Sequence, residues 1–184
     1  MNLWKSLLIG FGTYVVLTFL GNLLVAGLTI GLAAYFAFDI WTIITTCFTG
    51  LDGLNPFSFE IYGGMLTAIT IIPLGTTQAY LSAIGSILVP IVPGLTAAIL
   101  AGKFGQTSLN GFFGMLITGI AITIYPIILL FVNPPAVLGL LPLINGSIYP
   151  VVVSAPWLQA IFTSVIGVLI GAFWGGLAAF FGRE

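Results

Sequence analysis

Charged residues are rare in this chain, and their positions constrain its fold more than any other feature. Only three of the 184 residues are Lys or Arg, and four are Asp or Glu. The cations are Lys5, Lys103 and Arg183, at the start, middle and end, with long apolar stretches between them. An ionised side chain at the centre of a bilayer costs about 2.5–3.5 kcal/mol on insertion scales. We therefore expect each cation at an aqueous boundary and the apolar stretches to cross a membrane.

The same three cations predict the direction of the crossings. Lys and Arg are retained preferentially on the cytoplasmic side, so an even number of crossings should separate each cation from the next. We expect a multi-pass protein of the cell membrane with both termini in the cytoplasm. The composition agrees, because 60% of the residues are hydrophobic and 4% are charged, against about 25% charged in ordinary soluble domains.

The apolar stretches predict an all-α integral membrane protein, a polytopic helical bundle with four main transmembrane helices. The first stretch, residues 6–38, would be roughly 50 Å long as one helix, beyond the about 30 Å hydrocarbon core. It is expected to tilt, break or turn, with Gly21-Asn22 and the pair Gly27 and Gly31 as candidate break points. The other predicted spans are residues 80–102, 110–132 and 157–181.

Two apolar excursions are expected on the outer side, residues 37–77 and 133–156. The first contains Asp39, Asp52 and Glu60, and no Lys or Arg. In an alternative with six crossings, residues 23–50 and 61–77 are additional spans, and Asp52 and Glu60 lie in a cytoplasmic hairpin. The number of crossings between each cation and the next is even in both arrangements, so the cations do not distinguish them.

The chain is expected to form a single transmembrane domain over residues 1–184. Whether this domain contains a weak parallel repeat is left open by the sequence. Ser6-Leu7 followed by Phe11-Gly12 recurs as Ser108-Leu109 followed by Phe113-Gly114. Halves 1–105 and 106–184 would then each enter and leave on the same side, as in some transporters. Short matches also arise by chance in so apolar a sequence.

Small residues recur at every fourth position in the last predicted span, in a pattern typical of a glycine zipper. Residues four apart share one face of a helix, and the absence of bulky side chains lets another backbone approach closely. We therefore predict helix-packing faces on two spans, without knowing whether their partners belong to this chain or another. The predicted packing residues are Gly167, Gly171, Gly175 and Ala179, and on the second span Gly94, Ala98 and Gly102.

Prolines inside the predicted spans are candidate helix kinks. Pro90 and Pro93 lie in the second span and Pro126 in the third. Each removes a backbone donor and frees a carbonyl, which a neighbouring helix or a cavity must satisfy. Such prolines either bend a helix to fit its neighbour or shape a central site.

The residue types that perform catalysis or bind metals are nearly absent. The chain has no histidine and one cysteine, Cys47, so the commonest general base and the usual haem and zinc ligands are missing. We expect no enzyme activity, no cofactor and no bound metal. Among the carboxylates, Asp39 is the candidate functional acid because it adjoins a very apolar segment. Asn145-Gly146-Ser147 matches the glycosylation pattern and falls in the second outer excursion.

Scarcity of polar groups favours a non-catalytic multi-pass subunit that packs into and stabilises a larger membrane assembly, such as a respiratory or other energy-converting complex. Its expected partners are the lipid bilayer and other integral membrane subunits, or further copies of itself. Nucleic acid is not expected, because no basic patch is present to collect phosphates. An alternative is a small oligomeric channel or transporter for a mostly neutral solute, and a third is a structural or envelope membrane protein.

Overall fold

The structure, a computed structural model, describes residues 2–29, 31–37, 40, 43–44, 77–132 and 156–182. Regular secondary structure in these residues is entirely helical, which confirms the all-α class. Four helices are long, with 28, 29, 25 and 26 residues. They are α1 (Asn2–Thr29), α6 (Thr77–Gly105), α7 (Ser108–Val132) and α10 (Pro156–Phe181), and the short α2 (Leu32–Phe36) follows α1.

The first apolar stretch is interrupted at Gly31, one of the candidate break points. Helix α1 continues through Gly21-Asn22 and Gly27 and ends at Thr29. Gly31 has a φ of 86° and precedes α2, a conformation that glycine adopts without the steric cost of a Cβ atom. The other three long helices begin at most three residues before the predicted spans and end at most three residues after them.

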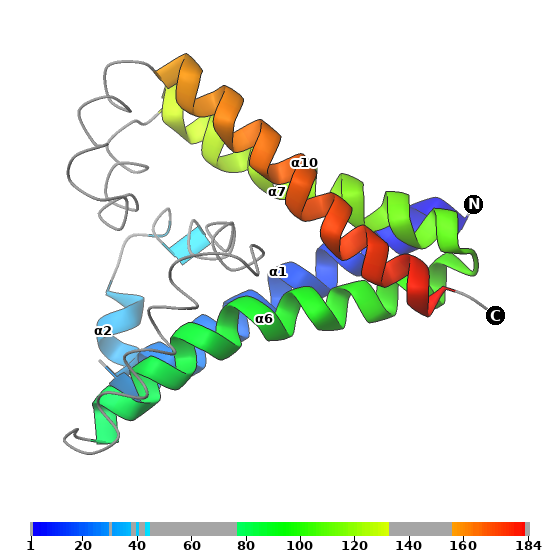
Figure 1. The fold of residues 1–184 in the computed structure, drawn as a ribbon. Helices are drawn as coiled ribbons and strands as arrows, with labels where there is room; N and C mark the ends of the chain where they lie inside the picture. The colour runs from blue at the N-terminus through cyan, green and yellow to red at the C-terminus, as the bar shows by residue number, and fades with distance from the viewer. Residues whose placement is uncertain are drawn as a thin grey trace.

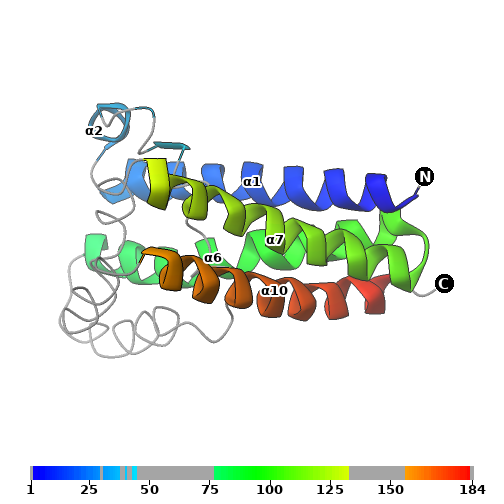
Figure 2. The same ribbon diagram turned by 90° about the horizontal axis from the view of Figure 1, so that it is seen from above.

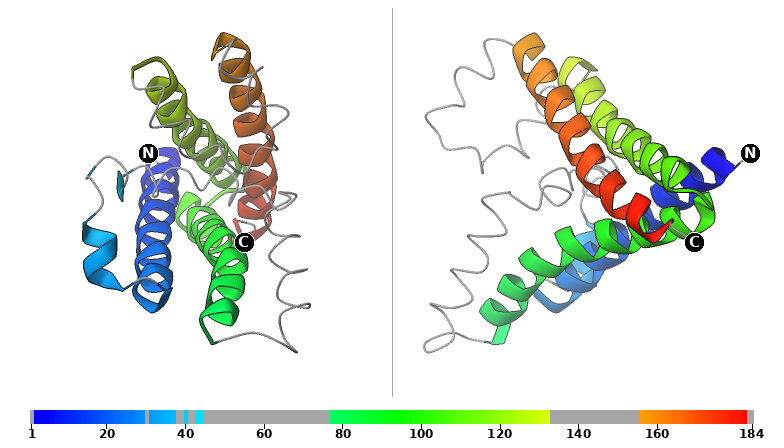
Figure 3. Two further views of the ribbon diagram at one scale, coloured as in Figure 1. Left: turned by 90° about the vertical axis from the view of Figure 1, so that its left-hand side faces the viewer. Right: turned by 45° about the vertical axis from the view of Figure 1, so that its right-hand side comes forward.

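The four long helices form two antiparallel pairs, α1 with α6 and α7 with α10 (Figures 1 and 2). The pairs meet at one end and diverge toward the other, so that the molecule has the outline of a V (Figures 1 and 3). The start of α1, the turn between α6 and α7 and the end of α10 all lie at the closed end of the V, which we call the common end. Each half of the sequence supplies one pair, whereas the repeat itself stays a prediction.

The turn between α6 and α7 is short because both helix ends are capped by side chains. Gln106 has a φ of 60°, the left-handed conformation that often ends helices. Thr107 Oγ1 accepts a hydrogen bond of 3.2 Å from the Asn110 backbone N–H, as an N-cap residue does. Asn110 Nδ2 in turn donates to the carbonyl of Gly105 at 3.1 Å. Helix α7 therefore starts at Ser108, two residues before the predicted span.

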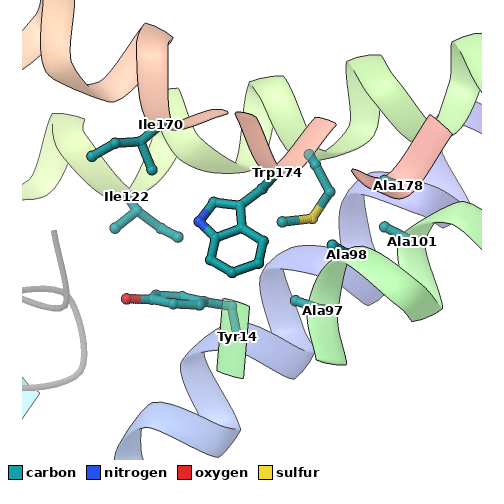
Figure 4. Close-up of a cluster of buried hydrophobic side chains, with 9 residues drawn as sticks. Tyr14, Ala97, Ala98, Ala101, Ile122, Ile170, Trp174 and Ala178 are labelled. Atoms are coloured by element: carbon teal, nitrogen blue, oxygen red, sulfur yellow. The ribbon is translucent and has the colours of Figure 1, made fainter. Parts of the chain in front are cut away.

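The buried core lies where the two helix pairs meet. Small alanines lie toward the common end, whereas Trp174 and Tyr14 lie further along (Figure 4). The cluster comprises Tyr14, Ala97, Ala98, Ala101, Met115, Ile122, Ile170, Trp174 and Ala178.

Large apolar side chains face outward on all four long helices. Two helical stretches, Asn2–Leu28 and Ser108–Tyr125, are long and apolar enough to cross a membrane. The exposed side chains include Leu8, Val16, Leu20 and Leu24 on α1, Leu88, Val92 and Leu95 on α6, Phe113, Ile117, Ile124 and Ile128 on α7, and Ile161, Val165, Leu169 and Phe173 on α10.

Several predictions fall on residues outside the described ranges. The alternative with six crossings concerns residues 23–50 and 61–77. Within these two ranges, α1 runs without a break through residues 23–29, and α2 follows it. Apart from these helices and a few single residues, the two ranges lie outside the described residues. The individual residues named in the sequence analysis that lie outside the described ranges are Asp39, Cys47, Asp52, Glu60, Asn145 and Arg183.

Candidate functional site

The glycines of α10 lie directly against the backbone of α7. A Cβ atom at Gly171 would lie 2.7 Å from the carbonyl oxygen of Leu116, and one at Gly175 would lie 2.7 Å from that of Phe112. Gly167 faces the side chain of Thr123 in the same way. Real Cβ atoms do not approach so closely, so this part of α10 requires the absence of side chains. The partner of these glycines is a helix of the same chain.

The fourth residue of the predicted α10 face, Ala179, is only half-buried. Its neighbour Ala178 is fully buried, and its carbonyl oxygen would lie 2.9 Å from a Cβ atom at Gly111 of α7. Because an α-helix has 3.6 residues per turn, each step of four residues rotates the contact position about 40° beyond one full turn. After two such steps, from Gly167 to Gly171 and on to Gly175, the contact returns by a step of three residues to Ala178.

The small residues of α6 face α10, so the contact runs between the two helix pairs. The indole of Trp174 lies on Gly94, where a Cβ atom would come within 2.8 Å of Cζ2. Ala98 is fully buried, and Gly102 lies against the carbonyl of Ala178. Residues Gly94, Ala98 and Gly102 are therefore brought together with the end of α10.

A third close contact, which the sequence patterns did not single out, joins α1 to α6 and α7. Ser6 Oγ donates a hydrogen bond of 2.8 Å to the carbonyl of Ala101, and the same side chain lies against Gly114 of α7. A Cβ atom at Gly10 would lie 2.9 Å from the Met115 sulfur. Ser6 and Gly10 are four residues apart, which is the spacing that could have revealed this face.

The two described cations lie at the common end of the bundle. Lys5 is in the first turns of α1 and Lys103 in the last turn of α6, and both are exposed. The two helix ends are joined by a hydrogen bond of 2.6 Å from Asn2 Nδ2 to Gln106 Oε1. Arg183 follows Gly182, which lies at the same end.

The prolines occur within continuous helices. Helix α6 includes Pro90 and Pro93, and α7 includes Pro126. Pro93 is fully buried, whereas the other two side chains lie outside the description. The predicted kinks stay predictions.

Four serine and threonine side chains are buried among the described residues, and three of them bond to backbone carbonyls. Besides Ser6, Thr118 Oγ1 donates to Gly114 O at 2.9 Å and Thr123 Oγ1 to Ile120 O at 2.7 Å. The fourth, Thr18, has no hydrogen-bond partner. No group of three or more metal-ligating side chains occurs in the part of the chain that the structure describes.

Comparisons with known proteins give no match. No known family, curated protein or solved structure is similar enough to this chain to match it. The function is therefore argued from the chain's own contacts and exposed surfaces.

Proposed function

We propose that the chain is a non-catalytic, multi-pass subunit of the cell membrane that packs into and stabilises a larger membrane assembly, such as a respiratory or other energy-converting complex. The observation that supports this proposal is the distribution of side-chain size. Leucines, isoleucines, valines and phenylalanines cover the outside of the four long helices, whereas glycines, alanines and hydroxyl side chains fill most close contacts inside.

This distribution suits a bilayer better than water. Lipid tails are as apolar as leucine, so helices in a membrane associate through close packing of small residues and through hydrogen bonds. Helices of 25–29 residues are roughly 37–44 Å long, enough to cross a hydrocarbon core of about 30 Å with some tilt. The glycines of α10 and α6 then act as the packing faces, in the manner of a glycine zipper.

The proposed topology places the common end in the cytoplasm. Lys5 and Lys103 lie at this end, and the two antiparallel pairs leave it and return to it. Because Lys and Arg are retained on the cytoplasmic side, four crossings with both termini inside are the simplest arrangement. The open end of the V then faces outward.

A packing role also follows from what the interior offers. Three of the four buried serine and threonine hydroxyls are bonded to backbone carbonyls, and hydrophobic residues form the described core cluster. Large apolar side chains are exposed on all four long helices, so they are available to lipid and to neighbouring subunits.

Purification in a mild detergent tests the proposal. The membrane fraction, washed at alkaline pH to remove peripheral proteins, should retain the chain, and solubilisation should yield it in stable co-migration with other polypeptides. A chain that the wash releases would refute the membrane location. A chain retained in the membrane that purifies alone as a homo-oligomer, and makes liposomes permeable to a small solute, would refute the subunit role and leave the location intact.

The second candidate function is a small oligomeric channel or transporter for a mostly neutral solute. The observation in its favour is that α1 and α7 carry buried hydroxyls, Ser6, Thr18, Thr118 and Thr123, because a neutral polar solute needs such groups along its path. In that case Asp39→Asn or Pro90→Ala should change the flux into liposomes while assembly stays intact. The subunit role predicts that Asp39→Asn is tolerated.

A further inference from the structure

Thr18 is the exception among the buried hydroxyls. It lies near the middle of α1, its side chain is 2% exposed, and its Oγ1 atom has no hydrogen-bond partner. A buried hydroxyl without a partner is destabilising, and in native proteins such a group commonly bonds to an ordered water. The environment of Thr18 therefore requires an explanation.

The antiparallel contacts of α1 with α6 define what lies opposite Thr18. Toward the common end, a Cβ atom at Gly10 would lie 3.2 Å from the Cβ of Ala101. Toward the open end, one at Gly21 would lie 3.2 Å from Cγ2 of Val89. The residue numbers in these two contacts sum to 111 and 110. Between them, a residue on the face of α1 that contacts α6 therefore lies opposite the α6 residue that gives about the same sum.

By this register, Thr18 lies opposite Pro93. The register also pairs Tyr14 with Ala97, and both lie close together in the buried cluster (Figure 4). Pro93 itself is fully buried, as a residue that faces α1 should be. Thr18 and Pro93 thus share one level of the contact between the two helices.

Pro93 leaves a backbone acceptor available at this level. A proline has no N–H, so the carbonyl of the residue four positions earlier, Val89, loses its usual partner within the helix. Helix carbonyls point toward the C-terminal end, so this oxygen points toward the turn that contains Pro93. An unpartnered donor on α1 and a freed acceptor on α6 therefore face the same place, yet they form no direct hydrogen bond.

We propose that a single buried water molecule bridges the Thr18 hydroxyl and the Val89 carbonyl. The hydroxyl of Thr18 donates to the water oxygen, and the water donates to the carbonyl oxygen of Val89. These two partners are the minimum that a buried water requires. The site lies within the α1–α6 pair and does not depend on the proposed role in an assembly.

A double-mutant cycle on the purified, full-length protein in detergent tests the bridge. Thr18→Val keeps the side-chain shape and removes the hydroxyl, and Pro93→Ala restores an N–H that occupies the Val89 carbonyl. We expect Thr18→Val to lower the midpoint of thermal denaturation by about 2–4 °C and to lower it by less than half as much in the Pro93→Ala background. Thr118→Val is the matched control, because its hydroxyl bonds within its own helix, and its effect should be the same in both backgrounds.

An unchanged or higher midpoint for Thr18→Val would overturn the proposal, because it would mean that the hydroxyl is dry and unpaired. So would an equal effect of Thr18→Val in both backgrounds. If Pro93→Ala does not fold, an experimental structure at a resolution that shows waters decides the matter. A water within about 2.7–3.2 Å of both oxygens supports the bridge, and an empty site or a direct bond from Thr18 to Val89 overturns it.

Discussion

The indole of Trp174 on α10 packs directly against Gly94 on α6. No side chain fits between them, because a Cβ atom at Gly94 would be 2.8 Å from Cζ2 of the ring and 2.9 Å from Cε2. The largest side chain of the core thus meets a residue with none. This contact joins the two helix pairs.

The first prediction concerns this contact. Gly94→Val should force Trp174 out of its place and destabilise the protein by about 1–3 kcal/mol, the usual cost of overpacking. Trp174→Ala should cost about 3–5 kcal/mol. Because the valine can occupy space that the indole leaves, the double variant should lose less than the sum of the two, as measured by denaturation in detergent. Leu95→Val, on the exposed side of α6, is the control and should change little. Additive losses would show that the two residues do not share a contact.

The second prediction concerns the face between α7 and α10. Gly175→Leu should prevent the two backbones from touching and abolish the folded, monodisperse protein, because the Phe112 carbonyl occupies the place of a Cβ atom. Gly176→Leu, at the next position, should be tolerated, since a Cβ atom there would meet nothing within 4 Å. Size-exclusion chromatography in detergent distinguishes the two outcomes. Equal behaviour of both variants would contradict the close contact.

The third prediction concerns the buried hydroxyl of Ser6. Ser6→Ala removes its hydrogen bond to Ala101 of α6 and should lower the free energy of unfolding by about 0.5–1.5 kcal/mol. Ser164→Ala is the matched control, because Ser164 is exposed and its hydroxyl bonds to Ala160 in its own helix. Its effect should be close to zero. A larger loss for the control than for Ser6→Ala would be inconsistent with the contact between α1 and α6.

The fourth prediction concerns the common end. With Cys47→Ser as background, Asn2→Cys and Gln106→Cys should form an intramolecular cross-link with a short bis-thiol reagent, because the ends of the two native side chains are joined by a hydrogen bond of 2.6 Å. Asn2→Cys paired with Val132→Cys is the control and should not form one, since Val132 ends α7 at the open end. Migration on a non-reducing gel reports the result. In intact cells both cysteines at the common end should resist an impermeant outside reagent, and labelling of either one would refute the cytoplasmic placement.

Helix positions could be predicted from the sequence because charge and apolar length act locally. Lys103 had to lie at a boundary, and the α6–α7 turn occurs three residues after it. Helix α7 begins two residues before the predicted span because Thr107 acts as its N-cap. A threonine before a helical apolar run is a recognised start signal, so the sequence contains the information for this boundary. The sequence offered several glycines as break points and did not single out Gly31, because a sequence does not show which glycine adopts a positive φ.

Contacts between helices were harder to predict than the helices themselves. Four-residue spacing marked Gly171 and Gly175 as packing positions, but a spacing does not name the partner, and in the structure it is α7. It also extended the face to Ala179, whereas the helix pitch places Ala178 there. Ser6 and Thr18 were not singled out, because serine and threonine are common in apolar helices and their burial depends on the neighbouring backbone.

The division of the bundle into one pair from each half of the sequence has a consequence for biosynthesis. A ribosome that adds about 5–20 residues per second completes α6 before any of α7 exists, so α1 has its partner while the second half is still being translated, over about 4–16 s. The later hairpin then docks onto a surface that is already assembled. A chain that ends after Gln106 and is released would be a hairpin with Gly94 and Gly102 uncovered, because both are covered by α10 in the full protein.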